Sequence, residues 1–255
     1  TTIITGMYPH QTNIVGNDPP VPPELGAITP REARGTPAYL KVRNDYLAQI
    51  DDLPALPRLL AQKGYVSHQS GKWWEGRYSR AGFTHGMTHG DRTRGGRAGD
   101  LGLFIGRERQ PNVVSVSDAG VPNFLANGDR PVKDVERSGG SMQPIYDFID
   151  QAQQVNKPFF VWYAPLLPHS PHTPPQRLLD KYIRKTESIR LARYWAMCER
   201  FDETVGQLVD HIDQRGLAEN TIVLFVADNG WIQRPDSRGY APRSKREPHE
   251  GGIRT

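Results

Sequence analysis

The sequence predicts an α/β fold, in which a largely parallel sheet is flanked by helices. Two continuous apolar runs, residues 159–164 and 221–227, each follow a segment whose apolar residues have helical spacing. Continuous rather than alternating apolar residues are typical of strands that are covered on both faces. A helix followed by a buried strand, at least twice, predicts a layered fold with parallel strands.

Three segments have the apolar spacing of helices. A short helix is expected over residues 51–60, with Asp51 or Asp52 as its N-cap. Apolar residues also recur every three or four positions over residues 142–152 and 195–212. These two helices precede the two apolar runs and complete the alternation on which the fold class depends.

The rest of the chain predicts loops within a single domain that spans residues 1–255. Glycine (25 residues) and proline (22 residues) are more frequent than in an average domain, but less frequent than in disordered chains. Residues 19–37 are rich in proline and are expected to form a surface excursion. Residues 76–140, rich in glycine and arginine, are interpreted as a loop-rich insertion.

Composition excludes several classes of protein. The longest apolar runs are far shorter than the ~18 residues of a membrane-spanning helix, so no membrane span is expected. The single cysteine, Cys198, excludes an internal disulfide framework and a CxxC zinc site, and its helical spacing indicates core packing. A formal net charge of +4 over 255 residues is weak support for a nucleic-acid partner, and none is expected.

Polar residues follow each apolar run, where ligands bind in open α/β sheets. Asp228 and Asn229 come directly after residues 221–227 and offer hard oxygen donors suited to calcium or magnesium. An Asn-Gly pair is also the commonest hairpin turn, but the flanking residues do not alternate as hairpin strands do. The two residues would supply only part of a shell of about six to eight oxygens.

Two histidines and two lysines are further candidates. His169 and His172 lie in a proline-stiffened loop, where a fixed imidazole could donate a proton, although ordinary exposed histidines have the same appearance. Lys72 follows a short predicted strand at residues 65–69, and Lys245 precedes a Glu-Gly-Gly sequence. Each lysine could be a fixed cation at a pocket wall or an ordinary surface lysine. The aliphatic part of the Lys72 side chain could then lie on the neighbouring tryptophan rings.

Taken together, these segments resemble the sulfatase family of the alkaline-phosphatase-like superfamily. The resemblance is carried in order by Thr5-Gly6-Met7-Tyr8-Pro9-His10-Gln11, Leu59 to Tyr65 leading into Gly71-Lys72-Trp73, Pro158-Phe159-Phe160 leading into Pro168-His169-Ser170-Pro171, Phe201 to Gly206, Gly216 to Thr221, Asp228-Asn229-Gly230, and Lys245 before Glu250-Gly251-Gly252. Each match alone is weak, whereas the ordered set is specific.

The resemblance implies an alkaline-phosphatase-like core that hydrolyses sulfate esters of aryl compounds or carbohydrates, with a calcium ion rather than magnesium. It also implies a formylglycine nucleophile, made from a motif that in the family lies just before the Thr-Gly-x-Tyr-Pro stretch. In this chain that position falls upstream of Thr1. We therefore expect a fragment truncated at both ends and inactive by itself, from a periplasmic, secreted or lysosomal enzyme that acts on a sulfated small molecule or glycan.

The family's functional residues match individual positions. Asp228 and Asn229 match calcium ligands, Lys72 and Lys245 match lysines that hold sulfate oxygens, and His169 matches the histidine near the leaving-group oxygen.

One position departs from the family pattern. Trp74 stands where the family's Gly-Lys-Trp-His sequence has the histidine that contacts the nucleophile, and His85 or His89 are the candidates to replace it.

Two alternative functions stay open on the sequence. A phosphodiesterase or phosphonate hydrolase of the same superfamily would hold a phosphorus ester in the same cradle. A non-catalytic protein could instead grip sulfated glycans through its lysines and arginines. Comparative rates on sulfate and phosphate esters distinguish the first alternative, and salt-sensitive glycan binding without turnover distinguishes the second.

Overall fold

The computed structural model describes residues 1–16, 18–88, 142–169, 172–237 and 241–244. The chain divides into two compact units. The first comprises Thr1–Leu103 and Asp147–Pro165, and the second comprises Phe104–Tyr146 and Leu166–Thr255. Most of the predicted loop-rich insertion lies outside the described residues.

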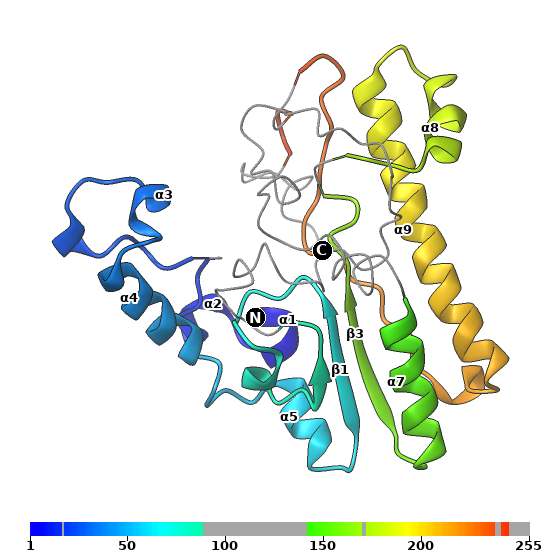
Figure 1. The fold of residues 1–255 in the computed structure, drawn as a ribbon, viewed down its shortest axis with the longest axis horizontal. Coiled ribbons are helices and arrows are strands. Elements are labelled where there is room, and N and C mark those ends of the chain that lie inside the picture. The colour runs from blue at the N-terminus through cyan, green and yellow to red at the C-terminus, as the bar shows by residue number, and fades with distance from the viewer. Residues whose placement is uncertain (17, 89–141, 170–171, 238–240, 245–255) are drawn as a thin grey trace. The chain divides into compact units, whose positions relative to one another are not determined.

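A parallel three-stranded sheet organises the first unit (Figure 1). Its strands are β1 (Val66–Gly71), β2 (His85–Gly86) and β3 (Phe159–Ala164), in the order β2-β1-β3. β1 pairs in parallel with both neighbours, and Val66 to Gly71 lie opposite Phe159 to Ala164 without a break in register. The predicted parallel sheet is confirmed, as are the strands at residues 65–69 and 159–164.

Several helices of the first unit have proline at their first or second position. Proline suits this position because its φ is already helical and its missing N–H needs no partner there. Thus the proline-rich residues 19–37 end at Pro37, the first residue of a helix. The helices are α1 (Thr2–Thr5), α2 (Pro9–Thr12), α3 (Pro30–Ala33), α4 (Pro37–Ala48), α5 (Leu56–Ala61) and α7 (Gln143–Gln154), with 3-10 turns η1 (Pro23–Leu25) and η2 (Tyr78–Ala81).

The predicted N-cap of the helix over residues 51–60 is wrong. α5 begins at Leu56 with Ala55 as its N-cap, whereas Asp51 and Asp52 lie in the turn after α4. Pro54 disfavours helical backbone at the residue before it, so the helix cannot start at either aspartate. The Asp51 carboxylate instead accepts a hydrogen bond from Arg80, with an N–O distance of 2.6 Å.

The two faces of the sheet are covered differently. On one face, Phe160 and Trp162 of β3 pack against a buried cluster that includes Ile4, Trp73 and Phe83. On the other face, the ring of His68 in β1 lies 5.1 Å from the ring of Phe148 in α7, measured between centroids. The sheet is therefore covered on both sides, with β1 largely buried and β3 partly buried.

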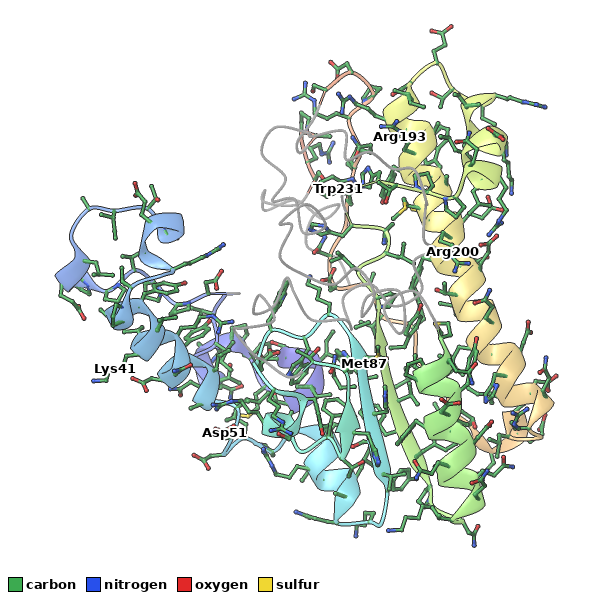
Figure 2. All side chains as sticks on the ribbon, in the orientation of Figure 1. Lys41, Asp51, Met87, Arg193, Arg200 and Trp231 are labelled. Atoms are coloured by element: carbon green, nitrogen blue, oxygen red, sulfur yellow. The ribbon has the colours of Figure 1, made fainter. Side chains whose placement is uncertain are left out.

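The second unit is built on a pair of helices, α8 (Gln176–Ile183) and α9 (Ile189–Gln214), followed by the 3-10 turn η7 (Ala218–Asn220). Arg177 of α8 forms two hydrogen bonds to Glu203 of α9, of 2.5 and 2.6 Å. Arg200, labelled on α9 in Figure 2, also donates to Glu203, at 3.1 Å.

α7 and α9 confirm the helices predicted over residues 142–152 and 195–212, and α8 was missed. No helix in the described part of the chain combines the length and apolarity of a membrane span.

The predicted strand at residues 221–227 is wrong in this structure. The segment has no assigned strand or helix, and its apolar side chains are exposed, with Ile222 at 86% and Leu224 at 82% of full accessibility. A continuous apolar sequence indicates that a segment favours burial, but it does not determine whether another strand lies beside that segment. Asp228 and Asn229 therefore follow an unpaired segment rather than a strand of the described sheet.

Candidate functional site

Lys72 is fixed at the carboxyl end of β1 by a close approach to β3. Gly71 has φ +82°, and a Cβ at that position would overlap the backbone carbonyl of Ala164. The Lys72 N–H donates a hydrogen bond to the same carbonyl oxygen. Only glycine allows this contact, so the Gly-Lys sequence places the lysine backbone at the end of two neighbouring parallel strands.

A buried glutamine supports the same turn. Gln69 is fully buried, and its side-chain amide donates to the Gly71 carbonyl at 3.1 Å and accepts from the Thr88 N–H at 3.1 Å. The Met87 N–H, near the end of β1 in Figure 2, donates to the Gln69 backbone carbonyl at 2.9 Å. Gln69 was not among the residues predicted from the sequence, although a strand composed of Ser-His-Gln-Ser is an unusual signal.

Trp73 and Trp74 have different environments. Trp73 is 4% exposed and forms edge-to-face contacts with Phe83 and Trp162, which anchors the loop after Lys72 in the core. The Lys72 ammonium lies 5.5 Å from the centroid of the Trp74 ring, within the range of a cation–π contact. The tryptophan that replaces the family histidine therefore contacts the lysine predicted to hold sulfate.

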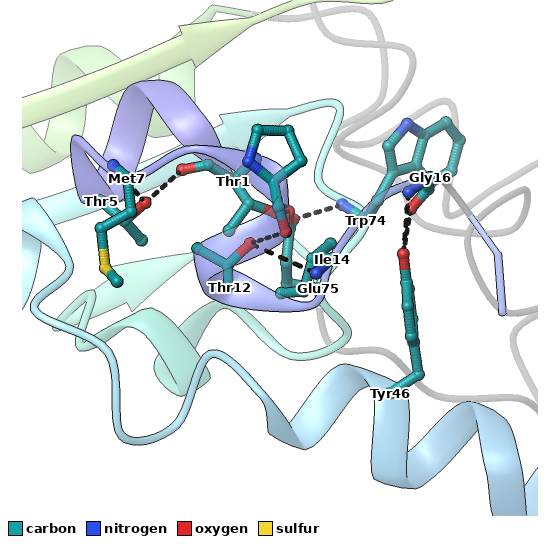
Figure 3. A network of polar contacts seen from close by, with 10 residues as sticks. Thr1, Thr5, Met7, Thr12, Ile14, Gly16, Tyr46, Trp74 and Glu75 are labelled. Carbon is teal, nitrogen blue, oxygen red and sulfur yellow. Dashed lines mark hydrogen bonds and ion pairs between the residues drawn. The ribbon is translucent and has the colours of Figure 1, made fainter.

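Glu75 is a second residue that sequence analysis missed. Its carboxylate is nearly buried and accepts hydrogen bonds from the Thr1 hydroxyl at 2.6 Å and from the Trp74 N–H at 3.0 Å (Figure 3). Glu75 thus ties the Lys72 loop to Thr1, the residue before α1.

His85 lies along the sheet rather than at its carboxyl end. It is opposite His68 in the β1–β2 register, and its ring centroid is 5.2 Å from that of Phe148. Its Nδ1 lies 2.9 Å from the Thr84 hydroxyl. The alternative candidate, His89, lies outside the described residues. A role for either histidine in place of the family residue stays a prediction.

His169 belongs to the second unit and follows two buried leucines, Leu166 and Leu167. Its backbone N–H donates to the Leu166 carbonyl at 2.7 Å, which closes a tight turn after the end of β3, and its side chain is exposed. His172 has its ring centroid 5.4 Å from that of Tyr194 of α9. The tight turn and the exposed ring suit a proton donor.

Asp228 and Asn229 also belong to the second unit. Asp228 is exposed, and the Asn229 side-chain NH₂ donates to the Gly230 carbonyl at 2.9 Å, which fixes the orientation of the amide. A carboxylate and an amide oxygen on successive residues offer donor types that suit a hard cation. Among the described residues no group of three or more His, Cys, Asp or Glu side chains could hold a metal, so these two oxygens fit calcium only as part of its shell.

The predicted convergence of these residues stays a prediction. Lys72 lies in the first unit, whereas His169, Asp228 and Asn229 lie in the second. Lys245 lies outside the described residues.

Cys198 is partly buried in α9. Burial raises the pKa of its thiol, which opposes formation of the reactive thiolate.

The chain matches known sulfatases along its length. The family model described as Sulfatase matches residues 1–255. The chain is 30% identical over 232 residues to N-acetylgalactosamine-6-sulfatase of Canis lupus familiaris, covering 83% of this chain and 41% of the relative. It is 26% identical over 208 residues to arylsulfatase J of Mus musculus, covering 80% of this chain and 33% of the relative.

A solved structure supports the fold. The crystal structure of Ps i-CgsB superposes with a TM-score of 0.60 at 20% sequence identity, covering 99% of this chain and 52% of that chain. The chain spans about two fifths of the length of the first of these curated relatives and about half of the solved structure. With the family model matching from the first residue to the last, the chain belongs to the sulfatase family.

Proposed function

We propose that this chain forms part of a sulfuric ester hydrolase that cleaves carbohydrate or aryl sulfates. The observation that supports this most directly is the position of Lys72, held at the carboxyl end of β1 by Gly71 and β3 in a chain that matches the sulfatase model throughout. Relatives named as an N-acetylgalactosamine-6-sulfatase and an arylsulfatase support both substrate classes.

Each candidate residue has a role that fits its chemistry. Cleavage of a sulfate ester develops negative charge on the departing oxygen. Lys72 and Lys245 would hold sulfate oxygens, where fixed cations stabilise that charge. His169 would donate a proton to the leaving oxygen from its exposed position.

Asp228 and Asn229 would provide two oxygen ligands for a calcium ion. Calcium, when bound there, supplies positive charge that polarises the sulfuryl group. The nucleophile would be a formylglycine, by resemblance to the family. A periplasmic, secreted or lysosomal location is proposed on the same basis.

Binding of an aryl sulfate to the purified chain tests this proposal. Isothermal titration with 4-nitrophenyl sulfate in the presence of calcium should show binding that Lys72→Ala weakens about tenfold or more, because a charge-assisted contact is lost. Lys63→Ala, at an exposed lysine outside the site, is the matched control and should bind like the wild type. Equal affinity in Lys72→Ala, or preferential binding of 4-nitrophenyl phosphate, would contradict a sulfate site at this lysine.

A further inference from the structure

The turn that joins α8 to α9 in the second unit has a concentration of positive charge (Figure 1). Residues 181–193 contain five basic side chains and one acidic side chain, Glu187, so their formal net charge of +4 equals that of the whole chain. The basic residues are Lys181, Arg184, Lys185, Arg190 and Arg193. The proposed sulfate contacts, proton donor and calcium ligands use none of them.

Contacts to two other segments of the second unit fix the backbone of this turn. The Ser188 hydroxyl accepts a hydrogen bond from the Leu191 N–H at 3.3 Å, which caps α9, and donates to the Pro235 carbonyl at 2.5 Å. At the end of α8, the ring of Tyr182 lies 6.1 Å from the ring of Trp195 of α9, measured between centroids. The positive charges are therefore carried by a backbone that is held on both sides.

Most of this charge is not neutralised within the second unit. Lys181 donates a hydrogen bond to Glu199 at 2.6 Å, whereas the other four basic residues form no ion pair with a carboxylate in the described part of the chain. Farther from the turn, Arg177 and Arg200 are both hydrogen-bonded to Glu203. Basic residues along the helix pair are thus paired, and those at the turn are available to an external anion.

The side chains at the turn suit oxyanions. Arg184 and Arg193 are exposed, and Arg193 is labelled on α9 in Figure 2. The Lys185 ammonium lies 5.1 Å from the centroid of the Tyr182 ring, which restricts its position through a cation–π contact. Three of the four unpaired cations are arginines, whose planar guanidinium can donate two parallel hydrogen bonds to the oxygens of one anionic group.

The distribution of the charges favours a polymer over a small anion. Arg184 and Lys185 lie directly after α8, whereas Arg190 and Arg193 lie in the first two turns of α9. A small anion can contact only part of this set. A chain that carries anionic groups at intervals can contact the whole set, and each contact raises the effective concentration of the next group.

We infer that the turn between α8 and α9 binds the chain of a sulfated polysaccharide, through Arg184, Lys185, Arg190 and Arg193. The inference rests on the proposed function, which favours a sulfated carbohydrate over other polyanions. The turn would hold the polymer through residues that take no part in cleavage of the ester.

A triple variant of the turn tests the inference against a matched variant elsewhere. Isothermal titration of the purified chain with chondroitin 6-sulfate should give binding that the combination of Arg184→Gln, Lys185→Gln and Arg193→Gln weakens about tenfold or more, because three charge-assisted contacts are lost. The control combines Lys41→Gln, Lys63→Gln and Lys157→Gln, which removes the same charge from exposed lysines of the first unit and should change the affinity less than about twofold. Urea denaturation confirms that both variants fold.

Two further titrations define the partner. Unsulfated chondroitin has the same sugars and carboxylates and should bind more weakly than chondroitin 6-sulfate. Equal losses in the two triple variants, equal binding of the unsulfated polymer, or no binding by the wild type would each overturn the inference. Tighter binding of duplex DNA or of phosphatidylserine vesicles would overturn it in favour of another polyanion.

The proposed function is tested separately in the same variants. The triple variant of the turn should bind 4-nitrophenyl sulfate like the wild type, because the turn supplies no contact to the single sulfate. If Lys72→Ala leaves the affinity for 4-nitrophenyl sulfate unchanged, the proposed function fails, whatever the turn does. If only the turn variant fails to weaken polysaccharide binding, the inference fails and the proposed function stands.

Discussion

Gly71 is the residue on which the position of Lys72 depends most directly. Its positive φ and its contact with Ala164 both exclude a side chain, whereas Gly64 has φ +83° with open space around its missing Cβ. Substitutions at these two glycines therefore distinguish the cost of backbone strain alone from the cost of strain together with steric overlap.

We expect Gly71→Ala to lower the free energy of unfolding by more than about 3 kcal/mol, because overlap with the Ala164 backbone adds to the strain. Gly64→Ala should cost only the left-handed backbone penalty, about 1–2 kcal/mol. Urea denaturation followed by circular dichroism measures both values. Equal losses in the two variants would show that β1 and β3 do not approach closely at Gly71.

His68 is a buried histidine with a consequence for stability. It is 6% exposed, its Nδ1 has no hydrogen-bond partner among the described residues, and burial together with the nearby His85 lowers its pKa from 6.5 to about 4. The folded protein therefore holds His68 neutral at a pH where the unfolded chain binds a proton.

Stability should consequently fall as the pH drops from about 6.5 to 4, since the unfolded state binds more protons in this range. A shift of this size corresponds to about 3 kcal/mol between pH 7 and pH 4. Denaturation of the wild type and of His68→Leu across this range gives the contribution of His68 by difference. Parallel pH profiles would mean that His68 ionises normally in the folded protein.

Individual site residues were only partly predictable from the sequence. Lys72 could be singled out in the sequence because the residue before it, Gly71, must be glycine to allow the contact with the Ala164 backbone. Glu75 gave no such signal and Gln69 only an unusual strand composition, because their importance depends on burial and on partners distant in the sequence.

At the scale of elements, residues 221–227 differ most from expectation. The side chains of Ile222, Leu224 and Phe225 are exposed by 72–86%, although the segment is rich in residues that favour strands. An exposed apolar segment of this composition tends to pair with another chain.

The double substitution Ile222→Lys and Leu224→Lys should therefore reduce self-association and change the free energy of unfolding by less than about 0.5 kcal/mol. Sedimentation velocity and urea denaturation measure the two quantities. Ile145→Lys in α7, where the side chain is fully buried, is the destabilising control. A loss of stability comparable to that control would show that the segment is buried in solution.

β3 and the helices α7 and α9 were predictable because their apolar residues follow the pattern of a covered strand or of a helix with one apolar face, whereas α4 was not predicted. The ends of the helices, and the segments that lie beside each element, were less predictable. α5 begins at Leu56, after the N-cap Ala55, because of Pro54 rather than at an aspartate, and α4 lacks a consistent apolar face. For residues 221–227 the sequence predicts a preference for burial, whereas pairing requires a neighbouring strand.

At the scale of the whole molecule, the family and the fold follow from motifs spread along the chain, and the family model matches residues 1–255. The convergence of the candidate residues is a stronger claim. Lys72 comes from the first unit and Asp228 and Asn229 from the second, so a common sulfate site requires that the units bring them together.

A double-mutant cycle on Lys72 and Asp228 tests this claim most directly. The affinity for 4-nitrophenyl sulfate is measured with calcium present in the wild type, Lys72→Ala, Asp228→Ala and the double variant. If both residues act on one bound sulfate, each single substitution weakens binding about tenfold, and the effects couple by more than about 0.5 kcal/mol. Wild-type affinity in Asp228→Ala, with Lys72→Ala alone weakening binding, would contradict a shared site.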